Sequence, residues 1–196
     1  MIRIMFYGAT AGNGDGRSST GTLSMKSLLL SFTFAILSTQ ALADGQHHAT
    51  SRYVEEAGRE VKSLSEADVD ELTSGGGWGL AKPAELNGYP GPSHVLELKN
   101  QIGLTDGQLQ KVQQVFDLMQ ARASAEGRIF VDAERKLDAA FRSRTITETS
   151  LGDLVAKAEA SRSRLRFIHL AAHLEATQVL DPGQIAIYEE HRGYSK

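Results

Sequence analysis

Residues 104–142 read LTDGQLQKVQQVFDLMQARASAEGRIFVDAERKLDAAFR, and apolar side chains recur in this run every three or four positions. Glu126 is the one polar interruption. Apolar residues at this spacing line one face of an α-helix. The sequence therefore predicts a single long helix from Asp106 to about Arg142, with an apolar face made of Leu109, Val112, Phe116, Met119, Ala123, Phe130, Ala133, Leu137 and Ala140.

A second helix with the same spacing is predicted from about Glu148 to Val179, after a short connection at residues 143–147. Ser161 and Glu175 weaken its apolar face. No segment of the sequence alternates apolar and polar residues with the period of a strand. We therefore expect an all-α fold: a long antiparallel helical hairpin with short flanking helices.

The flanking helices are expected upstream and downstream of this hairpin. Residues 80–92 are dense in turn-forming residues and are predicted to form no helix. Trp78, among glycines, either anchors this segment on the hairpin or is an exposed contact residue, and the anchor is favoured. The expected short helices are Ser51–Lys62, Ser65–Leu72, His94–Ile102 (capped by Ser93) and Pro182 to about His191.

The long helix has more apolar surface than one return helix covers. Soluble monomers rarely expose a continuous apolar stripe of this length. Burial against a second copy would remove it, so the sequence predicts a homodimer. The residues concerned are Phe116, Met119, Phe130, Leu137 and Phe141.

The N-terminal region has the pattern of a secretory signal peptide. Met25-Lys26 precedes an apolar run at residues 28–37, which ends in Ala41-Leu-Ala43. The run is too short to span a bilayer. We expect residues 1–43 to be a start codon assigned too early plus a cleaved signal, and the mature chain to be periplasmic and not membrane-spanning. Residues 44–92 are then a region of polar short helices and a Gly/Pro-rich segment, and residues 93–196 the hairpin domain.

Composition excludes several functions. The chain has a formal net charge of −3, and loss of residues 1–43 makes it more acidic, which argues against nucleic-acid binding. It has no cysteine, so disulfides, thiolate metal sites and cysteine nucleophiles are excluded. It also lacks a nucleophile elbow, a phosphate-binding loop and a His-Glu-x-x-His motif. We therefore expect a protein that is not an enzyme.

Two predicted helix starts share one design. Thr105 with Gln108, and Asp181 with Gln184, have the spacing of a capping box, in which the cap side chain and the third helical side chain each bind the other's backbone N–H. Thr145 with Glu148 has the same spacing at the hairpin turn. Such residues begin helices and by themselves imply no ligand.

The two Leu-x-x-x-Gln segments at 104–108 and 180–184, with the signal peptide and the helical hairpin, resemble the LTxxQ-motif family. This family includes Spy/CpxP-type periplasmic chaperones and related periplasmic heavy-metal sensors. The resemblance covers about residues 93–192 and implies a dimeric helical cradle that holds unfolded or envelope proteins. Residues 75–92 depart from the chaperone pattern and look like uncharacterised members grouped with the family.

Four residues are candidates for a metal site. His169 and His173 are one helical turn apart, so both rings can face one ion, and His94 with Glu97 is a second pair. Both pairs lie near the hairpin end opposite the 143–147 turn. This set would suit Zn, Ni, Co or Cu, and predicts metal sensing or resistance as the alternative function. Histidines with a structural role are the competing interpretation.

The arginines of the distal hairpin are candidates for a client-binding surface. A basic, partly apolar face suits weak and broad binding of unfolded proteins. The competing interpretation is a solvated helix face paired with nearby acids. The candidate residues are Arg142, Arg144, Arg162, Arg166, Phe130 and Phe141.

Overall fold

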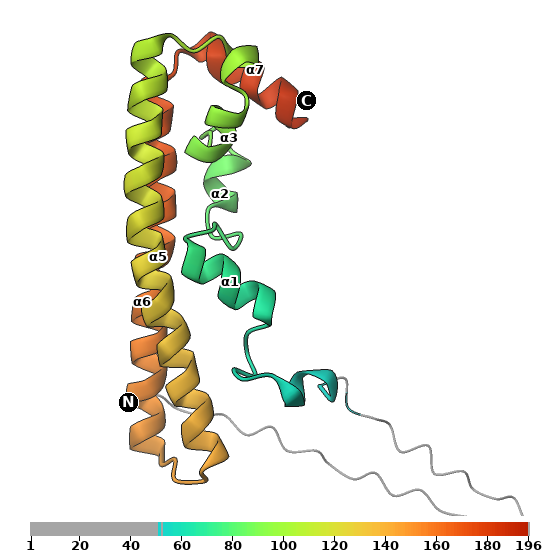
Figure 1. The fold of residues 1–196 in the computed structure, drawn as a ribbon, viewed down its shortest axis with the longest axis vertical. Coiled ribbons are helices and arrows are strands. Elements are labelled where there is room, and N and C mark those ends of the chain that lie inside the picture. The colour runs from blue at the N-terminus through green and yellow to red at the C-terminus, as the bar shows by residue number, and fades with distance from the viewer. Residues whose placement is uncertain (1–50, 52, 196) are drawn as a thin grey trace, which may run out of the picture. The chain divides into compact units, whose positions relative to one another are not determined.

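The computed structural model describes residue 51 and residues 53–195, and every regular element in this part of the chain is helical (Figure 1). The expected all-α fold class is confirmed. The predicted signal peptide and the start at Asp44 lie outside the described residues. The elements are η1 (Glu55–Gly58), α1 (Glu66–Ser74), α2 (Lys82–Glu85), α3 (Pro92–Glu97), α4 (Lys99–Ile102), α5 (Asp106–Arg142), α6 (Glu148–Val179) and α7 (Pro182–Arg192).

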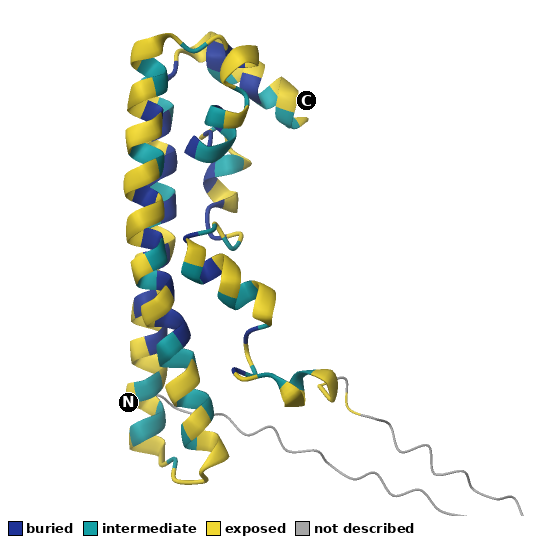
Figure 2. Cartoon of the chain, viewed as in Figure 1, coloured by how far each residue is buried: buried dark blue, intermediate teal, exposed yellow. Residues whose placement is uncertain are grey.

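The two longest helices, α5 and α6, lie side by side along most of their length (Figure 1). Their bounds agree with the prediction, because apolar spacing and capping residues both define them. The buried residues gather on the sides that face the partner helix and the short N-terminal helices (Figure 2). Those almost fully buried include Val112, Ala123, Ala158, Leu165 and Ala172.

Two of the three polar interruptions of the apolar faces, Glu126 and Ser161, contact each other, whereas Glu175 is exposed on α6. The Ser161 hydroxyl donates a hydrogen bond of 2.6 Å to Oε1 of Glu126, and Arg164 Nη2 lies 2.8 Å from the same atom. Burial raises the pKa of Glu126, but the hydrogen bonds from Arg164 and Ser161 outweigh it and lower the pKa. The carboxylate is therefore ionised and hydrogen-bonded between the two helices.

Both expected capping boxes form, and their glutamines are joined. Gln108 Nε2 donates to Gln184 Oε1 at 2.7 Å, and Gln184 Nε2 donates to Gln108 Oε1 at 3.0 Å. Each Oε1 also accepts from the backbone N–H of its own cap, Thr105 or Asp181. Gln108 Nε2 donates further to the carbonyl of Val179 at 2.9 Å, which ties the start of α5 to the end of α6.

We expect Gln108→Ala and Gln184→Ala each to lower the free energy of unfolding by about 1–2 kcal/mol, because each removes a cap bond and the two hydrogen bonds between the amides. The double variant should lose about 1 kcal/mol less than the sum of the two, since the paired atoms leave together. Chemical denaturation of the four proteins measures this coupling. Gln110→Ala, on the exposed side of α5, is the control with no expected effect, and strict additivity would contradict a direct pair.

The third predicted box is wrong in its residues. The N-cap of α6 is Thr147, whose side chain accepts from the N–H of Ser150, and Ser150 reaches back to the Thr147 N–H. Thr145 instead lies in the turn, where its hydroxyl is 2.8 Å from that of Ser143. Arg144 takes a left-handed conformation with a φ of 55° there. The observed cap therefore lies two residues later in the chain than the predicted one.

The short N-terminal helices cover one side of α5 and α6. α1 packs on α5, α2 on α6, and α3 on both (Figure 1). Trp78 anchors the connecting loop, as the sequence favoured: its indole N–H donates to Asp68 Oδ1 at 2.8 Å, and its ring packs on Phe130. Residues 61–98, called here the cover segment, therefore share a core with the long helices.

Several details of the cover segment differ from the sequence expectation. The described residues of the predicted helix Ser51–Lys62 contain only the short 3₁₀ helix η1, and Val61 is buried in the irregular stretch that follows it. The 80–92 segment does contain a helix, α2, which Pro83 opens rather than breaks. Pro92, not a Ser93 cap, begins α3, and the predicted helix 94–102 is divided at Leu98.

The apolar stripe that predicted a dimer is covered within the chain over much of its length. Met119 and Phe130 are 8% and 3% exposed because α1 to α3 and Trp78 lie over them. Phe141 stays 53% exposed near the 143–147 turn. A second copy is therefore not needed to bury the centre of this stripe.

A second apolar cluster holds the C-terminal helix beside the cover segment. α7 packs against α4, and Tyr188 is 1% exposed within this cluster. The other buried members are Val95, Ile102, Val112 and Leu180. α3, α4 and α7 therefore share one apolar core at the end of the helix pair where Gln108 and Gln184 are joined.

Candidate functional site

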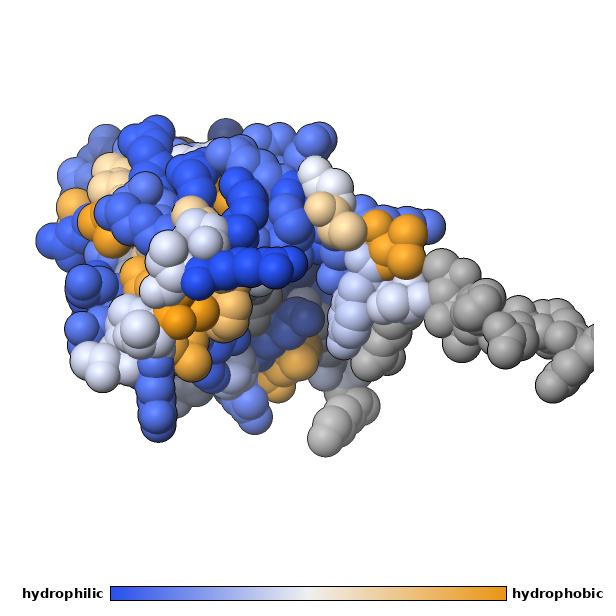
Figure 3. Space-filling view, turned by 90° about the horizontal axis from the view of Figure 1, so that it is seen from below, coloured by the Kyte–Doolittle hydropathy of each residue, from blue (hydrophilic) through white to orange (hydrophobic). Residues whose placement is uncertain are grey.

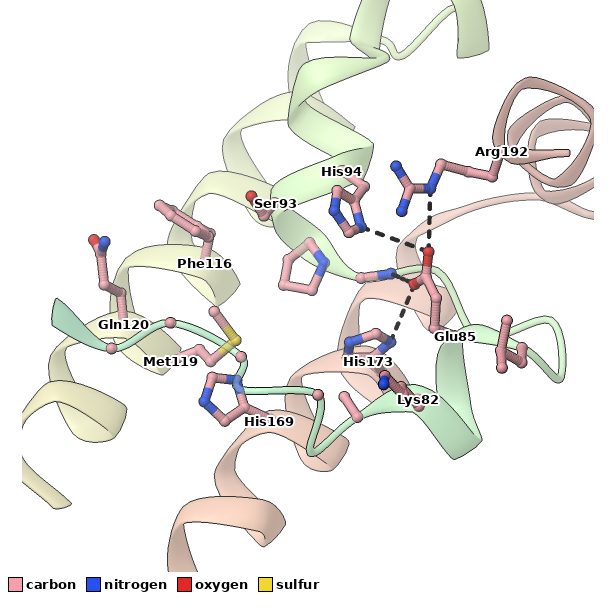
Figure 4. Close-up of a pocket in the computed structure, with 18 of the residues that line it drawn as sticks. Lys82, Glu85, Ser93, His94, Phe116, Met119, Gln120, His169, His173 and Arg192 are labelled. Carbon is pink, nitrogen blue, oxygen red and sulfur yellow. Dashed lines mark hydrogen bonds and ion pairs between the residues drawn. The ribbon is translucent and has the colours of Figure 1, made fainter. Parts of the chain in front are cut away.

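A pocket of about 560 Å³ lies between the cover segment and the long helices (Figure 4). Its walls come from the 74–79 loop, α2, the start of α3, α5, α6 and the end of α7. This volume is within the range of small-molecule binding sites. The titratable side chains that line it are Lys82, Glu85, His94, His169, His173, Arg192 and Tyr194.

Glu85, the last residue of α2, is the centre of the polar side of this pocket. Its Oε1 accepts a 2.5 Å hydrogen bond from the Tyr188 hydroxyl, and its Oε2 accepts one of 3.1 Å from the Gly91 N–H. Arg192 Nε lies 3.3 Å from Oε1, close enough for an ion pair but not aligned as a hydrogen-bond donor. One carboxylate thus links α2, α7 and the 86–91 loop.

Two histidines also face this carboxylate. His94 Nδ1 is 3.5 Å from Oε1 of Glu85, and His173 Nδ1 is 3.7 Å from Oε2 (Figure 4). Burial by itself raises the pKa of Glu85, but hydrogen bonds from His94, Tyr188 and the Gly91 N–H outweigh it and hold the pKa at about 2. Burial and the adjacent carboxylate both raise the pKa of Tyr188, so its hydroxyl remains a donor.

The tautomer of His173 follows from its backbone contact. Its Nδ1 lies 2.7 Å from the carbonyl oxygen of Tyr89, so Nδ1 carries the hydrogen and Nε2 is the acceptor in the neutral ring. The ring packs on Gly91, where an added Cβ would lie 2.9 Å from Cε1. Glycine at 91 therefore lets the loop close over the histidine.

His169 is buried deeper, with 3% of its surface exposed. Burial lowers its pKa, and nearby His173 lowers it further, so the ring is neutral at pH 7. A hydrogen bond joins it to the backbone of Gly76. Among the described residues, its Nε2 has no hydrogen-bond partner.

Three of the four predicted metal ligands line this pocket, but they do not form an assembled metal site. His94 and His173 direct Nδ1 toward Glu85, whereas Glu97 is exposed and lies near the hydroxyl of Ser93. Within residue 51 and residues 53–195, no group of three or more His, Asp or Glu is placed to hold a metal ion. Metal binding by His94, Glu97, His169 and His173 stays a prediction.

Sequence reasoning missed Glu85, the residue that organises the site. One signal was present: Glu85 is the only acidic residue in the Gly/Pro-rich segment 75–92. A lone carboxylate in such a segment is either solvated or bound to a specific partner. The partners of Glu85 lie up to 107 positions away in the sequence: His94, His173, Tyr188 and Arg192. Only the tertiary fold brings them together.

The predicted client-binding residues are not one surface. Phe130 is buried against Trp78, so its assignment to an exposed client-binding surface is wrong. Arg142 pairs with Asp138 and donates to the carbonyl of Glu60, while Phe141 beside it is exposed. Seen from below, hydrophobic surface forms separate patches within a hydrophilic surround (Figure 3).

The remaining arginines are divided between two places. Arg162 lies over the Trp78 ring, 5.9 Å from its centroid, and also pairs with Glu159. Arg166 lines a hollow with Trp78 and Arg162. Arg144 is exposed in the 143–147 turn, away from this hollow.

A second surface, which the sequence did not indicate, follows the contact line of α5 and α6. Two hollows lie along it, one lined by Leu118 and Phe167 and a larger one of about 270 Å³ lined by Ile129 and Leu154. The lining positions on α5 recur every three or four residues, so they share one face of the helix. This surface is called the seam, and its apolar members include Val115, Leu118, Ile129, Leu154, Phe167 and Ala171.

Comparison with known proteins adds no relative. No family model matches the sequence, and no curated protein or solved structure matches it either. In the part of the chain that the structure describes, no helix is both long and apolar enough to cross a membrane.

Proposed function

We propose that this protein is a non-enzymatic, chaperone-like binding protein of the periplasm that holds unfolded or partner proteins on the seam. The observation that carries the proposal is the exposure of Phe167, which is 72% exposed on α6. Leu118 and Ile129, which line the seam on α5, are 47% and 52% exposed. Exposed apolar residues gathered in a groove are characteristic of surfaces that bind other proteins.

The charges beside the seam support an extended, apolar and acidic segment as the occupant. Four basic side chains line the two hollows; Lys136 is paired with Asp132 and Arg164 with Glu126, whereas Arg122 and Lys157 form no ion pair with any described residue. Basic groups beside an apolar groove attract acidic segments and leave apolar contacts to provide most of the affinity. The basic residues are Arg122, Lys136, Lys157 and Arg164.

The cover segment determines which side of the helix pair is available. It buries the side that includes Ala123 and Phe130, so a client on that side would have to displace α1 to α3. The seam needs no such displacement. The resemblance to the LTxxQ-motif family supports the envelope location and the client class. The seam is the surface on which we propose that clients bind.

The proposal predicts that the double variant Leu118→Ser/Phe167→Ser binds a reduced, unfolded client at least about tenfold more weakly than the wild type. The change removes apolar surface whose burial against the client contributes about 1.4 kcal/mol or more to the binding free energy. Suppression of client aggregation, measured by light scattering against chaperone concentration, reports the difference.

Ile187→Ser is the matched control, because Ile187 is also exposed, at 37%, but lies on α7 away from the seam. Circular dichroism of all variants verifies that the helices remain. Equal aggregation suppression by the double variant and the control would overturn the seam as the client surface. A wild-type protein that suppresses no aggregation would overturn the chaperone function.

A further inference from the structure

We infer that the pocket beside Glu85 binds a small molecule that has an apolar body and one carboxylate. The inference uses a different surface from the seam and does not depend on client binding. It comes from the division of the pocket into an apolar side and a cationic side (Figure 4).

The apolar side is formed by long side chains of α5. Phe116 and Met119 lie together there, away from Glu85 (Figure 4). Met119 is 8% exposed, so its thioether forms part of a fixed wall rather than a mobile surface. Ala81 and Pro92 add apolar surface from the cover segment. An apolar body of a few carbons fits this side, because burial of its surface is favourable.

The charged side has more cations than anions. Lys82 and Arg192 line it together with one carboxylate, that of Glu85. Among the described residues, no acid forms an ion pair with Lys82, which is exposed at the start of α2. A ligand carboxylate placed near Lys82 therefore gains a charge partner and displaces none.

A cationic ligand fits this side poorly. Its partner would have to be Glu85, whose two oxygens already accept from the Tyr188 hydroxyl and the Gly91 N–H and face Arg192. A second cation there would lie beside the Arg192 guanidinium. The arrangement of charges therefore selects an anion over a cation or a neutral molecule.

A ligand in this position touches both the cover segment and the long helices. Lys82 belongs to the first, and Phe116 and Met119 belong to the second. Binding would therefore hold the cover segment on α5 and α6, and the protein should unfold at a higher temperature in the presence of the ligand.

Three probes with the same eight-carbon chain test the inference: octanoate, octanol and octylammonium. Calorimetric titration of the mature protein should show octanoate binding at least tenfold more tightly than the other two, and octanoate should raise Tm. Lys82→Glu should weaken octanoate binding at least tenfold. Lys99→Glu, an exposed lysine of α4 outside the pocket, should leave it unchanged.

Other outcomes would overturn the inference. Octanol binding as tightly as octanoate would show that the charge is not recognised, and tighter binding of octylammonium would reveal Glu85 as the recognition group. Failure of octanoate and of 3-phenylpropanoate to bind at millimolar concentration would exclude this ligand class. Phe167→Ser should not change octanoate binding; a loss there would place the ligand on the seam instead.

Discussion

Gly127→Ala is expected to lower the free energy of unfolding by about 3 kcal/mol, although alanine is the better helix former. A Cβ at this position on α5 would lie 2.0 Å from the carbonyl oxygen of Leu72 and 2.7 Å from its carbonyl carbon. Both atoms are backbone, so no side chain can rotate away. α1 must therefore shift away from α5 and expose part of the core that contains Leu72, Trp78 and Phe130.

Gly152→Ala in α6 is the matched control. It is also a helical glycine, but an added Cβ there meets nothing within 4 Å. The same substitution should therefore stabilise the protein by about 1 kcal/mol, the ordinary helix-propensity difference. Urea denaturation of both variants measures the two effects. A stabilised Gly127→Ala protein would contradict the close packing of α1 on α5.

Glu85→Gln is expected to lower the free energy of unfolding by about 3 kcal/mol at pH 7, because it leaves Arg192 near a neutral group inside the polar cluster. The pKa shift gives a similar magnitude: a drop from 4.5 to about 2 corresponds to about 3 kcal/mol. Glu97→Gln, an exposed change on neighbouring α3, should have little effect.

The pH dependence of this difference follows from the lowered pKa of Glu85. Because the folded protein holds the ionised form more tightly than the unfolded chain does, the contribution is fully present above pH 4.5. It is lost as the pH falls from 4.5 toward about 2. The gap between wild type and Glu85→Gln should therefore shrink over that range in denaturation series at several pH values. A constant gap would show that the Glu85 charge does not stabilise the fold.

The apolar spacing and caps were sufficient to predict the long helices. α5 and α6 have the bounds expected from their sequences, since a 3.6-residue period and a capping box are local features. The same local reasoning failed at Thr145, because the N-cap of α6 is Thr147. It also failed for Ser51–Lys62, where Tyr53 and Val54 are exposed and Val61 is buried outside any α-helix.

Residues that look like defects in a single helix are explained by contacts between helices. Glu126 interrupts the apolar face of α5, and Ser161 interrupts that of α6. The hydrogen bond between them gives each polar group a partner within the helix pair. Gly127, which no helix-propensity argument would favour, provides the space for the Leu72 carbonyl. The joined amides of Gln108 and Gln184 likewise require both caps to be adjacent in space.

The sequence by itself determined the helical class, the two long helices and the cap of α5, because these depend on neighbours within about four positions. The tertiary structure alone decided which apolar face the cover segment buries, which part of α5 and α6 remains as the seam, and how Glu85 meets His94, His173, Tyr188 and Arg192. These contacts join residues up to 107 positions apart. Their free energy depends on how whole helices pack, which local spacing does not encode.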